Sequence, residues 1–200
     1  MIEGNGVLIC ELFEDNRIGT AIWKNTIPEK YKKYPIIGQG ATSVVLDMLD
    51  GNVMMLTRDS IKKDWLVHGL KIASWPETID IRHPKSRALS EMRVYVLIMP
   101  KLFALTANNK TIIKKAITEY NQLITRDRGQ EYIVKYLEKY PTGLFAELFD
   151  FLSSYYPEQY SEDFLIRNFM QTENGNIVLI DPVVDAELAS VLRSLKMPRY

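Results

Sequence analysis

The sequence contains little cysteine or histidine. It has a single cysteine, Cys10, and two histidines, His68 and His83. One cysteine cannot form a disulfide within the chain or build a cysteine-rich zinc site, and neither histidine has partners at metal-ligand spacing. Cys10 lies in the apolar run 7–13, where we expect it to pack inside a buried strand. Disulfide-stabilised scaffolds and cysteine-rich zinc domains are therefore excluded.

An excess of either charge is also missing. Lysine plus arginine and aspartate plus glutamate both number 25, so the formal net charge is zero, which argues against a general nucleic-acid binder. No apolar run approaches the ~20 residues of a membrane span, and the amino terminus lacks the pattern of a signal peptide. We therefore expect a cytoplasmic protein that binds neither nucleic acid nor membrane.

Strand patterns dominate residues 1–99, and the apolar fraction of 46% is enough for a sizeable core. The segment 36–46 is expected to form two strands joined by a glycine-rich turn, and Asp50-Gly51-Asn52 is a strong hairpin signal. Ser60 can cap a helix that Pro76 should end. Further strands are expected at 7–13, 19–23, 53–57 and 93–99.

Helical patterns dominate residues 100–200. Helices are expected at 111–126, 131–140, 142–152 and 186–195. We also expect a loop at 155–162 and a turn at Asn174-Gly175 that precedes a strand at 177–180. The sequence thus predicts an α+β fold with a strand-rich amino lobe, residues 1–99, and a helical carboxy lobe, residues 100–200.

Three oxygen-bearing side chains near the end of the sequence form the most informative pattern. Four residues separate Asp163 from Asn168, and Asp181 closes the strand expected at 177–180. A tight loop can return the asparagine beside the aspartate, and a turn at Gly175 can bring the strand back antiparallel. Magnesium prefers a few oxygen ligands together with phosphate oxygens and water. A surface aspartate, a helix-capping asparagine and a strand-ending aspartate remain the alternative.

The glycine-rich turn supplies a second pattern. Gly38 and Gly40 precede Ser43 and Val45 in Gly-Gln-Gly-Ala-Thr-Ser-Val-Val. Glycines let the backbone approach phosphates that a side chain would push away. The turn is therefore a candidate cover for a nucleotide, with a plain tight turn as the alternative.

Together these motifs resemble a small protein kinase of the compact kind that bacteriophages encode. The turn matches the kinase pattern G-x-G-x-x-G-x-V, with Ser43 in place of the third glycine. The strand at 93–99 and the residues after it resemble the hinge between kinase lobes, which implies that backbone groups at Met99 and Lys101 bind adenine.

The resemblance implies a bilobal protein-kinase-like fold, with an antiparallel sheet in the amino lobe and a reduced, mainly helical carboxy lobe. It implies that Asp163 is the catalytic aspartate and that Asn168 and Asp181 bind magnesium. ATP and magnesium are then the expected cofactors, and a serine or threonine hydroxyl of a protein is the expected acceptor. For a phage protein, this partner would be a host protein in the host cytoplasm.

The sequence departs from the kinase pattern at several points. Ser161-Glu162-Asp163 replaces H-R-D, and Asp181-Pro182-Val183 replaces D-F-G. The lysine expected in the third strand is Met55. Arg58 is the leading substitute, because a guanidinium can fork onto phosphate oxygens, and a solvated charge at a strand end is the alternative. Lys62 and Lys63, which begin the following helix, are the other basic residues that could reach the phosphates.

Three functions remain open from the sequence. The first is an active phosphotransferase. The second is a pseudokinase that binds a partner protein, which Met55 motivates. The third is another transfer on the same fold, either phosphate to a small molecule or AMP to a protein.

Overall fold

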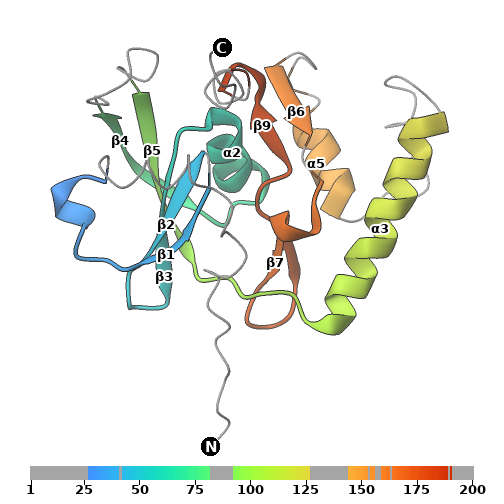
Figure 1. Ribbon diagram of the computed structural model, residues 1–200, viewed down its shortest axis with the longest axis horizontal. Helices are drawn as coiled ribbons and strands as arrows, with labels where there is room; N and C mark the ends of the chain where they lie inside the picture. The colour runs from blue at the N-terminus through green and yellow to red at the C-terminus, as the bar shows by residue number, and fades with distance from the viewer. Residues whose placement is uncertain are drawn as a thin grey trace, which may run out of the picture.

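Antiparallel strands and a few helices make up the part of the chain that the computed structural model describes (Figure 1). The described residues are 27–40, 42–81, 92–126, 144–152, 154–155, 159–162, 164–188 and 190. The predicted α+β class is confirmed. The strands predicted at 7–13 and 19–23 and the helix predicted at 131–140 lie outside these residues. No helix in the described ranges is long and apolar enough to cross a membrane.

A five-stranded antiparallel sheet is the main element among the described residues of the amino-terminal half. Its order is β1-β2-β3-β5-β4. The strands are β1 (Ile36–Gln39), β2 (Ser43–Asp47), β3 (Asn52–Thr57), β4 (Ser74–Ile81) and β5 (Met92–Pro100). Gly51 has a φ of 88° in the turn between β2 and β3, which confirms the predicted hairpin and explains why glycine stands there. A short 3₁₀ helix, η2 (Glu29–Tyr31), precedes the sheet.

The two faces of the sheet pack against different parts of the protein, because side chains alternate along each strand. One face contributes to the main core, which it shares with residues of the carboxy-terminal half: Val53, Met55, Leu97, Met99, Leu148, Val178, Leu179 and Val183. The other face packs with Ile27 and Tyr31 in a second, smaller core: Val44, Leu46, Met54, Leu56, Val94 and Val96. The division into lobes at residue 99 stays a prediction.

The helix after β3 is shorter than predicted. It consists of α2 (Ser60–Asp64) and a π-helical turn, η3 (Trp65–Gly69), and Asp59 caps it instead of Ser60. The prediction that Pro76 ends it is wrong, because Pro76 lies within β4. An edge strand tolerates proline, and here the register also shifts between Ser74 and Glu77.

The carboxy-terminal half combines helices with two short ladders. The helices are α3 (Ala107–Arg126) and α5 (Leu144–Leu152), and a 3₁₀ turn, η6 (Ile166–Asn168), follows later. Strands β7 (Phe169–Gln171) and β8 (Ile177–Leu179) form a hairpin, as predicted, with Gly175 at a φ of 81°. Strand β6 (Tyr160–Glu162) pairs with β9 (Val183–Asp185). The prediction of a loop at 155–162 is therefore wrong for residues 160–162, which form a strand. Of the helix predicted at 186–195, residues 186–188 and 190 are helical.

Trp65 joins the two halves of the molecule. Its side chain is fully buried, and its indole N–H donates to the Leu179 carbonyl at 2.7 Å. Its ring also packs against Phe151 of α5, with a centroid distance of 5.3 Å. Figure 1 shows α2 between the large sheet and strand β9. Helix α2 is therefore held over the end of the β7–β8 hairpin.

Candidate functional site

The β7–β8 hairpin brings two predicted site residues together. Phe169 pairs with Leu179, and just beyond this pair the Ile180 N–H donates to the Asn168 carbonyl at 2.9 Å. The backbone of Asn168 therefore lies beside the residue that precedes Asp181. The Asn168 side chain is buried, and the Asp181 side chain is about a third exposed, at 31%.

Asp163, the predicted catalytic aspartate, lies outside the described residues. The chain is described on both sides of it, and Glu162 pairs with Val183, two residues after Asp181. The β6–β9 ladder thus leads the chain to the neighbourhood of Asp181 immediately before position 163. The role of Asp163 stays a prediction.

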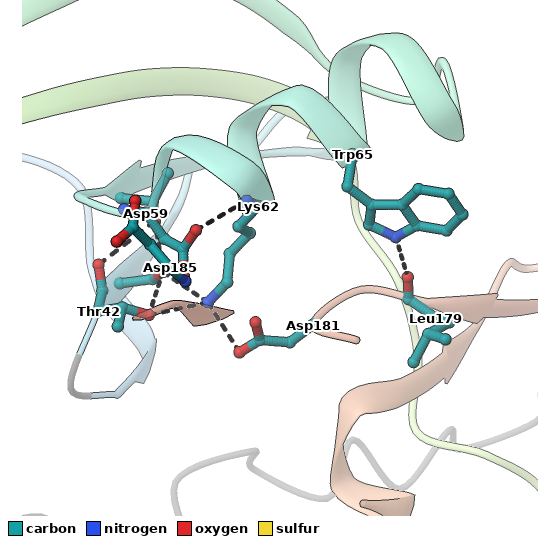
Figure 2. Close-up of polar contacts among 9 residues, drawn as sticks. Thr42, Asp59, Lys62, Trp65, Leu179, Asp181 and Asp185 are labelled. Carbon is teal, nitrogen blue, oxygen red and sulfur yellow. Dashed lines mark hydrogen bonds and ion pairs between the residues drawn. The ribbon is translucent and has the colours of Figure 1, made fainter. Parts of the chain in front are cut away.

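Lys62 links Asp181 to the glycine-rich turn (Figure 2). Its Nζ atom donates to Asp181 Oδ2 at 2.7 Å, to Thr42 Oγ1 at 2.9 Å and to Ser43 Oγ at 3.0 Å. The side chain is only 4% exposed. A lysine ammonium has three N–H donors, and each of them has an acceptor here. A buried ammonium needs such partners, because its loss of hydration is otherwise costly.

Asp59 precedes the first turn of α2 and caps it. It is fully buried, its Oδ1 accepts from the Lys62 N–H at 2.9 Å, and its Oδ2 accepts from the Asp185 N–H at 3.1 Å. Burial raises the pKa of Asp59, although the charge of Lys62 and these backbone hydrogen bonds oppose the rise. Ser60 Oγ also donates to Asp185 Oδ2 at 3.2 Å. The start of α2 is thus tied to strand β9.

The carboxyl end of the predicted nucleotide-binding turn contacts this cluster through Thr42 and Ser43. The Gly40 N–H donates to the Ser43 carbonyl at 2.7 Å, which closes the turn. Gly38 and Val45 form a cross-strand pair, and Val45 is half-buried against the main core. Ser43 faces Lys62, so the serine in place of the third kinase glycine has a contact of its own.

Gly40 is not required by the shape of the turn. It lacks the left-handed φ of Gly51 and Gly175, and an added Cβ would meet only the Ser43 carbonyl, at an ordinary 3.9 Å. The turn would accept the Cβ of an alanine there. This fits a turn in which glycine leaves room for another molecule.

The other two cations near the turn have different surroundings. Arg58 is buried, so the alternative of a solvated charge at a strand end is wrong. Burial lowers its pKa to about 10, and the guanidinium stays charged at neutral pH. Lys63 pairs with Asp64 at 2.7 Å and lies over the Trp75 ring at 4.2 Å.

The predicted hinge residues have structural contacts. Met99 is buried in β5 and pairs with Val53. The Lys101 N–H donates to the Gly51 carbonyl at 3.0 Å, and its ammonium pairs with Asp47 at 2.7 Å, which lowers the pKa of that carboxyl. The N–H and the ammonium of Lys101 both bind the β2–β3 hairpin and hold it against the predicted hinge. Adenine binding by this segment stays a prediction.

A magnesium ion fits the chemistry of the pair at the end of the hairpin. Within the described ranges, no three His, Cys, Asp or Glu side chains gather as a metal site. Asn168 and Asp181 offer one amide and one carboxylate. Such a pair suits a cation that takes its other ligands from phosphate and water.

The sequence leaves Lys62 open as a phosphate contact but does not indicate its contacts with Asp181 and the glycine-rich turn. Its spacing held a usable signal, because Lys62 precedes Trp65 by three residues and Leu66 by four. Residues at these spacings share one face of a helix, and this face is buried. A lysine on a buried helical face needs an anionic or hydroxyl partner.

Comparisons of the chain with family models, curated proteins and solved structures gave no match. The function must therefore be inferred from the residues and their geometry.

Proposed function

We propose that the protein is an ATP-dependent phosphotransferase with a bilobal protein-kinase-like fold. With magnesium, it would transfer the γ-phosphate of ATP to a serine or threonine hydroxyl of a protein. This proposal joins the sequence motifs to the arrangement of the described residues.

The order of the parts along the chain supports the kinase-like fold. A glycine-rich turn joins β1 and β2, a helix follows β3, and β5 leads directly into residues 100–102. Asn168 and Asp181 then follow on either side of the β7–β8 hairpin. This is the order that the resemblance to kinases implies.

One observation carries the proposal: Lys62 donates both to Asp181 and to the hydroxyls of Thr42 and Ser43. The predicted metal ligand and the predicted phosphate-covering turn therefore contact the same ammonium. Motifs that arose separately would have no reason to meet at one point.

The chemistry assigned to the residues is positioning and charge stabilisation. Asn168 and Asp181 would hold magnesium, which neutralises the phosphates when bound. The backbone around Gly40 would cover the phosphates. Asp163 would orient the acceptor hydroxyl and take its proton, which leaves the substrate as a phosphate ester and releases ADP.

The test compares Asp181→Asn with Asp80→Asn, a change at an exposed strand position. We expect the first variant to lose ATP turnover by about 100-fold or more, because it lacks the anionic metal ligand. The second should keep wild-type turnover. Circular dichroism checks that both are folded. Full turnover in Asp181→Asn would overturn the proposal.

A pseudokinase is the second candidate, and the burial of Met55 in β3 favours it. Met55 is 5% exposed and pairs with Val45 and Leu97, so the strand has no place for a lysine without repacking. Thermal unfolding with ATP, in the presence and absence of magnesium, separates the two. A magnesium-dependent rise in the midpoint supports the enzyme, and no rise at all supports the binding module.

The third candidate differs either in the group transferred or in the acceptor. Intact-mass spectrometry of cell lysate treated with the protein and ATP distinguishes the products. Phosphate added to a protein supports the proposal. AMP added to a protein, or a phosphorylated metabolite, would move the assignment to another transferase on the same fold.

A further inference from the structure

We propose that Lys62, carried by helix α2, supplies the phosphate-holding cation that strand β3 lacks. In the nucleotide-free protein, Asp181 holds this cation in place. The inference rests on the proposed function and names a positioning residue for it.

The site needs a cation from somewhere other than strand β3. Met55 occupies the position expected for lysine, and it is packed in the main core. A bound triphosphate carries several negative charges, and transfer of its γ-phosphate adds charge to the leaving oxygen. A site of this kind usually holds the phosphates with a lysine, which acts as a compact point charge.

Lys62 meets the geometric requirement. Its three acceptors are Thr42 and Ser43 from the turn and Asp181 from the hairpin, at 2.7 to 3.0 Å. Figure 2 shows the side chain running from α2 towards Asp181, with Thr42 on its flank. The ammonium therefore lies between the group predicted to cover the phosphates and the group predicted to bind their metal.

An exchange of one hydrogen bond would suffice to make Lys62 a phosphate ligand. When the carboxylate of Asp181 turns to a metal, the donor now bonded to its Oδ2 becomes available. A phosphate oxygen can accept that donor while the bonds to Thr42 and Ser43 persist. The ammonium needs no large movement.

Kinases pair this lysine with a glutamate in the helix after the third strand, and α2 contains no glutamate. Asp59 supplies the opposite charge instead. The buried carboxylate caps the turn that carries Lys62, and the charges of the two side chains attract each other. It also binds the Asp185 N–H in β9, which fixes the turn relative to the segment after Asp181. A counter-charge at the helix start thus takes the place of the usual partner in the helix.

Two other lysines, Lys63 and Lys101, have partners of their own. Lys63 is directed to Asp64, Trp75 and Tyr95, with its ammonium 5.0 Å from the Tyr95 ring. Lys101 is paired with Asp47 on the β2–β3 hairpin. Lys63→Met is therefore a matched control for Lys62→Met, since both residues lie in the same helix and are mostly buried.

The first experiment is labelling with an acyl-phosphate derivative of ATP in the presence of magnesium. A lysine Nζ near the phosphates attacks the acyl carbon as the neutral amine. An amide forms, the nitrogen loses a proton to solvent, the mixed anhydride breaks and ATP leaves. We expect mass spectrometry to locate the acyl group on Lys62 and excess ATP to suppress it. ATP-suppressible labelling of Lys63 or Lys101 instead would overturn the inference.

The second experiment measures ATP binding by calorimetry in the presence of magnesium. Lys62→Met should weaken affinity about 10- to 100-fold, the loss expected for one charge-assisted hydrogen bond, and Lys63→Met should leave it unchanged. Wild-type affinity in Lys62→Met would overturn the inference.

The results distinguish a failure of the inference from a failure of the proposed function. If wild-type protein binds ATP with magnesium but the label or the variants point away from Lys62, the inference fails and the phosphotransferase proposal stands. If wild-type protein binds no ATP at all, the proposed function fails and the inference with it.

Discussion

Lys62 Nζ lies 2.7 Å from Asp181 Oδ2, although the two residues are 119 positions apart in the sequence. This contact joins the first turn of α2 to the segment after β8. It places a cation from the amino-terminal half on a carboxylate of the carboxy-terminal half. We expect both the stability and the proposed chemistry of the protein to depend on it.

Breaking the pair should destabilise the nucleotide-free protein. Because Asp181 is about a third exposed, Asp181→Ala should lower the free energy of unfolding by about 2–3 kcal/mol, somewhat less than for a fully buried pair. The variant Lys62→Met/Asp181→Ala should lose less than the sum of the single changes, because neither charge is then left unpaired. Urea unfolding of the four proteins measures this coupling. Additive losses would show that the contact contributes nothing to stability.

Two glycines at turns of the amino-terminal sheet, Gly40 and Gly51, should respond differently to alanine. Gly51→Ala places alanine at a φ of 88° and should cost about 1–2 kcal/mol of stability, with ATP binding unchanged. Gly40→Ala should cost little stability, because its Cβ has space. It should weaken ATP binding by an amount on the order of tenfold, because the added Cβ would hold the phosphates away from the backbone. Unfolding curves and calorimetry on both variants check this, and unchanged binding in Gly40→Ala would argue for a plain turn.

Asp59 should give the protein a recognisable pH dependence. Burial raises the pKa of Asp59 in the folded protein, with Lys62 and Asp181 as the charges that face it. An acid of this kind favours the folded state fully below its unfolded pKa of about 4, and that contribution is lost as the pH rises through the folded pKa.

The variant Asp59→Asn isolates this effect, because asparagine can still cap the helix. From about pH 4 upwards, the stability of the wild type should fall relative to that of Asp59→Asn until the raised pKa of Asp59 has been passed. Chemical unfolding of both proteins across this range gives the difference. A difference that stays constant with pH would contradict the raised pKa.

Gly69 should be intolerant of substitution for a reason unrelated to its φ. A Cβ at this position would collide with the Trp65 ring, which is fully buried and bonded to Leu179. Gly69→Ala should therefore destabilise the protein by about 1–3 kcal/mol, as overpacking in a core does. Alanine at Gly175 provides a comparison, because its Cβ meets nothing within 4 Å and only the left-handed φ opposes it. Fluorescence of the tryptophans during unfolding reports on both variants.

Local signals accounted for the features that the sequence predicted well. Gly51 and Gly175 mark turns with left-handed backbone, and the strands beside them pair as expected. The turn at Gly175 also predicted that Asn168 and Asp181 lie close together along the backbone, because they precede and follow the two strands of one hairpin. Each of these predictions needed only a few neighbouring residues.

Long-range pairing accounts for what the sequence did not show. Strand β6 is recognisable only through its partner β9, and β4 contains Pro76, which argues against a strand unless the strand lies at an edge. The partners of Lys62 come from the turn before β2 and the segment after β8. No local pattern reports such contacts.

A crystal structure with a non-hydrolysable ATP analogue and magnesium tests the central claim most directly. The account predicts a metal ion about 2.1 Å from oxygens of Asn168 and Asp181, with Lys62 Nζ about 3 Å from a phosphate oxygen beneath the glycine-rich turn. A nucleotide bound elsewhere, or a nucleotide in this place with Lys62 directed away from its phosphates, would contradict it.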